Sequence, residues 1–191
     1  MLSTKTAKSL LVGVIALSVL SACTITPTPT NGTAPTTVSQ IRLDDYLGKW
    51  YEIGRLPMSF QDKCTHNVTA TYSLKDNGKI NVLNACATQD GMTSVNGEAY
   101  ATDETNAKLR VSFLPSFLKK LPIGKANYWV LASNQDTSGC YTSALVGTPN
   151  HKYLWVLSRT PTLDDTTYER YLGIAKQNGY ELSKFTKTPQ K

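Results

Sequence analysis

Short runs in which apolar and polar residues alternate dominate the chain from residue 47 onward. The clearest run is 66–74 (HNVTATYSL), and alternation resumes with Ile80 and Val82 after the turn-forming sequence Asp76-Asn77-Gly78. A period of two indicates a strand with one buried face, and Asn-Gly is typical of a tight hairpin turn. This stretch therefore predicts a β-hairpin. Six further strand-like runs bring the predicted strands to eight: 47–57, 95–101, 107–113, 127–132, 141–146 and 153–158.

The period changes to that of a helix after Pro161. Thr162 followed by Asp165 forms an N-terminal capping pattern, and Gly179 is suited to end a helix. The apolar residues between them fall at helical spacing: Tyr168, Tyr171, Leu172 and Ala175. We expect one amphipathic helix of about four turns, followed by a short strand over 180–186 that returns to the sheet edge.

Eight antiparallel strands with short connections are typical of a closed barrel, because closure removes the exposed edges that a flat meander would leave. The predicted fold class is all-β: an eight-stranded antiparallel up-and-down β-barrel with one C-terminal α-helix. Eight strands enclose room for one small ligand. The length of 191 residues is enough for one such domain.

The N-terminal segment has the pattern of a secretory signal. Lys5 and Lys8 precede an apolar run, 10–20, that is too short and wrongly flanked for a transmembrane helix. The run ends in Leu-Ser-Ala-Cys23, which resembles the bacterial lipobox, whose cysteine is acylated and becomes the mature N-terminus. We therefore expect a signal peptide (1–22), a lipidated Cys23 with a Thr/Pro-rich tether (23–40), and a folded domain (41–188).

The predicted lipid anchor and the net charge of the chain indicate where the protein is located and which partners it meets. Thr24 stands where many inner-membrane lipoproteins have Asp, so a lipid anchor in the cell outer membrane, facing the periplasm, is favoured. The formal charge of +6 falls to +4 once Lys5 and Lys8 leave with the signal. This mild excess fits a solvated surface or contact with anionic lipid, and no nucleic-acid-binding motif accompanies it.

Three segments in a fixed order carry a resemblance to a known family: 48–53 (GKWYEI), 68–74 (VTATYSL) followed by 76–78 (DNG), and 153–161 (YLWVLSRTP). Together they resemble the lipocalins, most closely the bacterial outer-membrane lipoprotein lipocalins and apolipoprotein D. The resemblance covers roughly residues 41–188. The middle motif of the family, a Thr-Asp-Tyr-like turn, is poorly kept, since residues 133–136 read SNQD.

The resemblance implies structural roles for Gly48, Trp50 and Arg159: Trp50 would plug the closed end of the barrel, with Arg159 laid across the indole. A guanidinium stacked on Trp gains a cation–π contact. If Trp50 points inward, strand alternation selects the other inward residues. Those expected to contact a ligand are Glu52, Val68, Ala70, Tyr72, Val82, Asn84, Leu109, Val111, Phe113, Trp129, Leu131 and Trp155, with Ile80 and Leu157 completing the wall.

Glu52 is the unusual member of this set. A carboxylate inside an apolar cup is costly unless it is paired. Two interpretations follow: Glu52 meets Tyr72, Asn84 or a water, or it waits for a cationic group of the ligand.

The four cysteines divide by position. Cys23 is the predicted lipid site. In an up-and-down barrel, Cys64 at the start of the second strand and Cys86 at the end of the third both lie at the open mouth, whereas Cys140 lies at the closed end. We expect a disulfide between Cys64 and Cys86 in an oxidising periplasm, with Cys140 left over.

These features predict a non-catalytic binding protein that stores or transports fatty acids or lysophospholipids for maintenance of the outer membrane. No metal site or cofactor is predicted, and a homodimer is possible. One alternative is a binder of haem, a pigment or another hydrophobic molecule, in which His66 or His151 would be an axial ligand. Another is an enzyme using a Cys64–His66 pair, which share one strand face at i, i+2.

The connection 114–125 (LPSFLKKLPIGK) joins the fifth and sixth predicted strands at the open mouth. It is apolar for a loop and carries three lysines. This combination is suited to resting on anionic lipid, with Phe117 and Leu118 in the interface and Lys119, Lys120 and Lys125 on phosphates. A lid over the mouth or a dimer contact are the alternatives.

Overall fold

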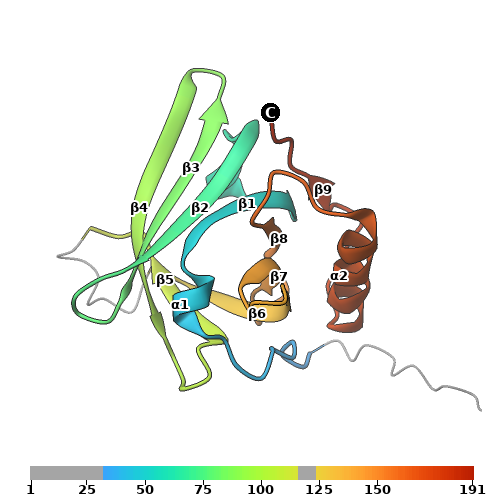
Figure 1. Ribbon diagram of the computed structural model, residues 1–191. Helices are drawn as coiled ribbons and strands as arrows, with labels where there is room; N and C mark the ends of the chain where they lie inside the picture. The colour runs from blue at the N-terminus through green and yellow to red at the C-terminus, as the bar shows by residue number, and fades with distance from the viewer. Residues whose placement is uncertain (1–31, 116–123) are drawn as a thin grey trace, which may run out of the picture.

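The computed structural model describes residues 32–115 and 124–191 (Figure 1). The predicted signal peptide, Cys23 and the first part of the tether lie outside these residues. So do Phe117, Leu118, Lys119 and Lys120 of the mouth loop. Within the described ranges, no helix is both long and apolar enough to cross a membrane.

The barrel is built from eight antiparallel strands in the described part of the chain, and a ninth short strand adds to β1. The strands are β1 (Gly48–Arg55), β2 (His66–Leu74), β3 (Ile80–Thr88), β4 (Gly91–Ala101), β5 (Lys108–Ser112), β6 (Lys125–Gln135), β7 (Tyr141–Gly147), β8 (Leu154–Ser158) and β9 (Thr186–Lys187). Each of the first seven strands pairs with the next, and β8 pairs with β1. The sheet therefore closes, as the sequence predicted.

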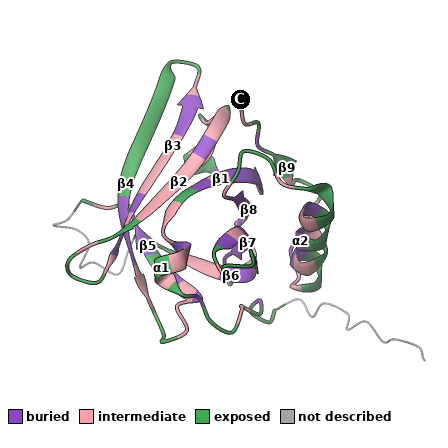
Figure 2. Ribbon diagram, viewed as in Figure 1, coloured by how far each residue is buried: buried purple, intermediate pink, exposed green. Residues whose placement is uncertain are grey.

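Within residues 32–115 and 124–191, three helical segments accompany the barrel: α1 (Leu43–Tyr46), the 3₁₀ turn η1 (Ser59–Gln61) and α2 (Asp165–Gln177). Figure 1 shows α2 lying against the outside of the barrel, apart from the β2–β3–β4 side. Its buried residues Tyr168, Tyr171 and Ala175 pack in one cluster with barrel residues such as Leu145 and Val156. Figure 2 shows the opposite face of α2 exposed, the amphipathic pattern that the helical spacing predicted.

Two predictions for the C-terminal part of the chain were wrong. The helix N-cap is Asp164, whose side chain accepts a hydrogen bond from the Thr167 N–H, so the role assigned to Thr162 was wrong. The segment 180–185 is not a strand, because Tyr180 is instead buried beside the barrel, where its hydroxyl donates to the Thr148 carbonyl. Only Thr186 and Lys187 return to the sheet, against the end of β1.

The closed end of the barrel is held by Arg159 and Trp50. The guanidinium lies 3.9 Å from the centroid of the indole ring, and Trp50 is fully buried. Arg159 also donates hydrogen bonds to four backbone carbonyls, at Asp45, Leu47, Lys49 and Tyr141. One side chain thereby connects α1, β1, β7 and the end of β8.

Gly48 is required beside this contact for two reasons. Its φ of +94° lies in the region that favours glycine, and a Cβ at this position would stand 3.3 Å from Arg159 Nη1. The glycine therefore lets the first strand begin directly under the guanidinium, which agrees with the structural roles expected for Gly48, Trp50 and Arg159.

Replacing Arg159 with Lys should destabilise the domain by about 2–3 kcal/mol, because a lysine ammonium cannot stack flat on Trp50 or reach four carbonyls at once. Denaturant unfolding of the purified protein measures the change in the free energy of unfolding. The matched control is Arg110→Lys, an exposed arginine on β5, which we expect to change stability by less than about 0.5 kcal/mol. Equal stability of the two variants would contradict a central role for Arg159.

Candidate ligand-binding site

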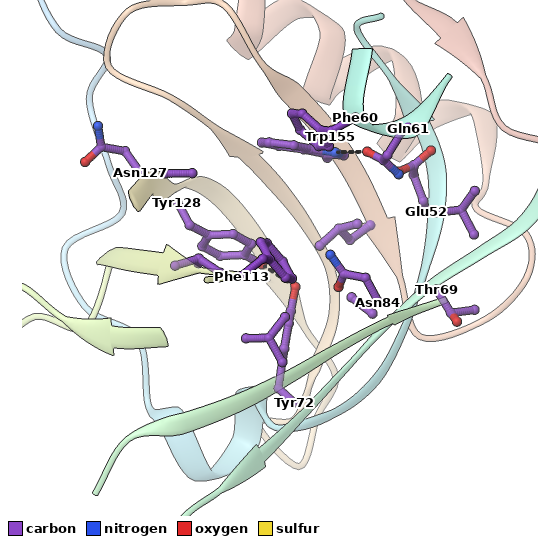
Figure 3. Close-up of a pocket in the computed structure, with 16 residues that line it drawn as sticks. Glu52, Phe60, Gln61, Thr69, Tyr72, Asn84, Phe113, Asn127, Tyr128 and Trp155 are labelled. Atoms are coloured by element: carbon purple, nitrogen blue, oxygen red, sulfur yellow. Dashed lines mark hydrogen bonds between the residues drawn. The ribbon is translucent and has the colours of Figure 1, made fainter. Parts of the chain in front are cut away.

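The end of the barrel opposite Trp50 opens into a cavity with an empty volume of about 700 Å³, its mouth included. Figure 3 shows side chains from β1, β2, β3, β6, β8 and η1 around it, among them Glu52, Tyr72, Asn84, Tyr128 and Trp155. The lining residues are Glu52, Phe60, Gln61, Val68, Thr69, Ala70, Tyr72, Val82, Asn84, Val111, Phe113, Ala126, Asn127, Tyr128, Trp155 and Leu157.

Nine of the twelve residues expected to contact a ligand line this cavity: Glu52, Val68, Ala70, Tyr72, Val82, Asn84, Val111, Phe113 and Trp155. Leu109 instead lines a smaller void nearer the closed end. Trp129 and Leu131 do not line the cavity; both pack in the cluster beneath α2.

The prediction that Trp129 and Leu131 point into the barrel was wrong. The inward-facing residues of β6 lie one position away from those predicted, so Tyr128 faces the interior instead of Trp129. Leu109 pairs with Tyr128, and Lys108 pairs with Trp129, so Tyr128 shares the inner face with Leu109. Both faces of β6 are apolar because α2 covers the outer face. The alternation of apolar and polar residues therefore does not show which face of β6 points into the barrel. Val111 was correctly predicted to face the interior of the barrel from β5. Pairing β6 with β5 would therefore have identified Tyr128 as an inward-facing residue.

Phe60 and Gln61 were missed because they belong to η1 in the connection between β1 and β2, where strand parity does not apply. Gln61 accepts a hydrogen bond from the Trp155 indole N–H at 3.3 Å, drawn in Figure 3. The 3₁₀ turn therefore forms part of the rim of the cavity.

Glu52 is paired, but not with the partners expected. Its carboxylate accepts hydrogen bonds from Arg55 Nη1 (2.6 Å), Thr188 Oγ1 (2.6 Å) and Gln61 Nε2 (3.1 Å). The expected pairing with Tyr72 or Asn84 was wrong. A register shift between Glu52 and Gly54 breaks the alternation of β1 and brings Arg55 to the carboxylate.

Thr188 belongs to a C-terminal segment that fills a gap in the barrel wall. The pairing of β1 with β2 ends at Tyr51 and Thr69. Beyond that point Gln190 Nε2 donates to the carbonyls of Glu52 and Val68, and thus joins the two strands through a side chain. The folded unit therefore uses residues beyond position 188.

Three tyrosine hydroxyls form a polar floor under the cavity. Tyr128 Oη lies 2.9 Å from Tyr46 Oη and 3.3 Å from Tyr72 Oη, and Tyr72 and Tyr128 line both the cavity and the void beneath it. Burial raises the pKa of Tyr72 to about 12 and raises those of Tyr46 and Tyr128 well above the usual value. All three phenols are therefore neutral at physiological pH.

The cysteines and histidines bear on the alternative functions. Cys64 and Cys86 form the expected disulfide, and among the described cysteines Cys140 is exposed and unpaired. The disulfide removes the thiolate that the Cys64–His66 alternative requires. Neither His66 nor His151 is among the described residues that line the cavity, so neither is placed to be an axial ligand within it.

The sequence profile of the lipocalin-like domain matches residues 41–190. This chain belongs to the lipocalin family. Relatives of this lipocalin come from bacteria, plants and animals. The outer membrane lipoprotein Blc of Escherichia coli K12 is 40% identical over 162 residues, 83% of this chain and 84% of the relative.

Temperature-induced lipocalin-1 of Arabidopsis thaliana is 39% identical over 156 residues, covering 80% and 81% of the two chains. Apolipoprotein D of Mus musculus is 36% identical over 150 residues, covering 76% and 75%. Among solved structures, insecticyanin of Manduca sexta superposes with a TM-score of 0.63 at 21% identity, covering 84% and 86%, which supports the fold. Family membership and the apolar cavity together indicate a protein that binds small hydrophobic ligands.

The tyrosine floor should make the lipocalin less stable at high pH. Because the pKa of Tyr72 rises to about 12 in the folded state, the folded protein keeps a proton that the unfolded chain loses near pH 10. This stabilisation is complete below pH of about 10 and is lost as pH rises toward 12, at up to about 1.4 kcal/mol per pH unit for each such tyrosine. Urea unfolding between pH of about 10 and about 12 should show that the free energy of unfolding falls less steeply with pH for Tyr72→Phe than for the unchanged protein. Equal dependence on pH in the two proteins would contradict a raised pKa for Tyr72.

Thr188→Val should lower stability by about 1.5–3 kcal/mol, since it removes a hydrogen bond to the buried Glu52 carboxylate while preserving side-chain shape. Thr186→Val, an exposed position on the same segment, is the matched control and should cost little. Chemical denaturation of both variants measures the difference. A loss that is no larger at Thr188 than at Thr186 would show that the C-terminal segment does not stabilise Glu52.

Proposed function

We propose that this lipocalin is a non-catalytic carrier or store of fatty acids and lysophospholipids, which binds the acyl chain inside the barrel. The observation that carries the proposal is the composition of the cavity wall. Glu52 is the one charged residue among its described lining residues, and it is already paired with Arg55. The rest of the wall is mostly aliphatic and aromatic, which suits a single hydrocarbon chain.

The proposed location is the outer membrane, with the domain held on its periplasmic side by a lipid on Cys23. The lipobox-like sequence and the Thr/Pro-rich tether support this arrangement. The bacterial relative from Escherichia coli, which is itself an outer membrane lipoprotein by name, also supports it. A tethered open barrel at a membrane surface is placed to collect single-chain lipids and to help maintain the membrane.

Blocking the cavity should abolish binding of a fluorescent fatty-acid probe. Val111→Arg places a charge in the apolar wall, and Ala70→Phe fills the same space with an apolar ring, so each removes room for the chain by a different route. We expect at least a tenfold loss of probe affinity in both. The control is Asn81→Arg, since Asn81 alternates with the cavity-lining Val82 and does not itself line the cavity.

Circular dichroism and unfolding midpoints establish that each variant retains the barrel before the titrations are compared. Unchanged probe affinity in both folded cavity variants would place the ligand elsewhere and exclude the proposed site.

A further inference from the structure

Asn84 is an amide set in an otherwise apolar part of the cavity wall. It lies on β3 between Val82 and Cys86, and its Cα pairs with Ala70 on β2. Figure 3 shows its side chain pointing into the cavity. Asn84 Oδ1 is buried and accepts no hydrogen bond from residues 32–115 or 124–191. A buried acceptor without a partner is costly, and this one belongs to a residue that lines the space a ligand would occupy.

Tyr72 provides a second acceptor on the same wall. Its hydroxyl donates to Tyr128 Oη at 3.3 Å, and no donor to Tyr72 Oη is found in the described part of the chain. Tyr72 pairs with Val82, two residues from Asn84 toward the closed end of the barrel. The inner part of the cavity thus presents two oxygen acceptors, from the amide and the phenol.

The charge of the wall favours a donor that is itself uncharged. None of the described lining residues is Lys or Arg, and the Glu52 carboxylate already holds the guanidinium of nearby Arg55. A carboxylate or phosphate pushed to the inner end would therefore be buried without an opposite charge, and it has no proton to give to either acceptor. A hydroxyl group is uncharged and has one proton to donate to one of the two acceptors.

We propose that the inner end of the cavity is a subsite for an uncharged hydroxyl at the buried end of a single-chain lipid, which donates its one proton to Asn84 Oδ1, with Tyr72 Oη on the same wall as the alternative acceptor. This inference rests on the proposed function and extends its ligands to neutral, hydroxyl-bearing single chains such as fatty alcohols and monoacylglycerols. Chains that enter methyl end first offer no proton to either acceptor, and we expect them to bind more weakly than hydroxyl-bearing chains of the same length.

The test compares two uncharged ligands of equal chain length, 1-dodecanol and dodecyl methyl ether. Each is titrated against the purified protein to displace a bound fluorescent fatty acid. The alcohol donates a hydrogen bond and the ether only accepts. One neutral hydrogen bond in a buried site corresponds to an affinity preference of about fivefold to tenfold for the alcohol. Asn84→Leu should reduce that preference to near unity, while the control Asn81→Leu, on the face of β3 away from the cavity lining, should keep it.

The same two probes are used with every variant. The difference between their hydration free energies therefore cancels when the alcohol-to-ether affinity ratios of the variants are compared. Tyr72→Phe is the second variant; it keeps the ring and should weaken the preference for the alcohol. An equal alcohol-to-ether ratio in the unchanged protein and Asn84→Leu, with both probes still displacing the fatty acid, would overturn the subsite alone. No displacement by either probe, and no binding of the fluorescent fatty acid, would overturn both the subsite and the proposed function.

Discussion

The contact between Arg159 and Trp50 is the constraint on which the rest of the barrel depends. The indole enters the closed end from β1, and the guanidinium covers it from the end of β8 while it binds carbonyls of α1, β1 and β7. The first and last barrel strands therefore meet at one side chain. With Trp50 fixed inward, the phase of β1 is set, and the neighbouring strands follow because cross-strand pairs share a face.

The two ends of the barrel are held by different interactions, and this difference leaves one of them open. The closed end combines an aromatic plug with hydrogen bonds to backbone groups. At the mouth, the C-terminal segment joins β1 to β2 through Gln190, and the disulfide ties the β1–β2 connection to the end of β3. These contacts join neighbouring strands and the connection beside them, so they brace the wall around the mouth of the cavity.

Most of the barrel could be predicted from the sequence because its strands have one apolar and one polar face. The hairpin around Asn77-Gly78, the motif residues Gly48, Trp50 and Arg159, and the disulfide partners Cys64 and Cys86 were all correct. Prediction failed where a third layer or a distant segment intervenes. Both faces of β6 are apolar under α2, which misplaced Trp129 and Leu131. The partners of Glu52 were missed because a register shift and Thr188, far away in the chain, decide them.

The polar groups in the cavity wall divide according to whether the protein itself satisfies them. Glu52 has three donors, and Tyr128 has two phenol neighbours, so the fold already accounts for both groups. The oxygen of Asn84 has no such partner in the described chain, although it lies in the same wall. A hydrophobic residue of similar size would remove the cost of this unpaired group, whereas replacing Glu52 would leave Arg55 unpaired. Burial alone therefore does not separate the polar residues of this cavity wall; the hydrogen bonds that each group already makes set Asn84 apart from Glu52 and Tyr128.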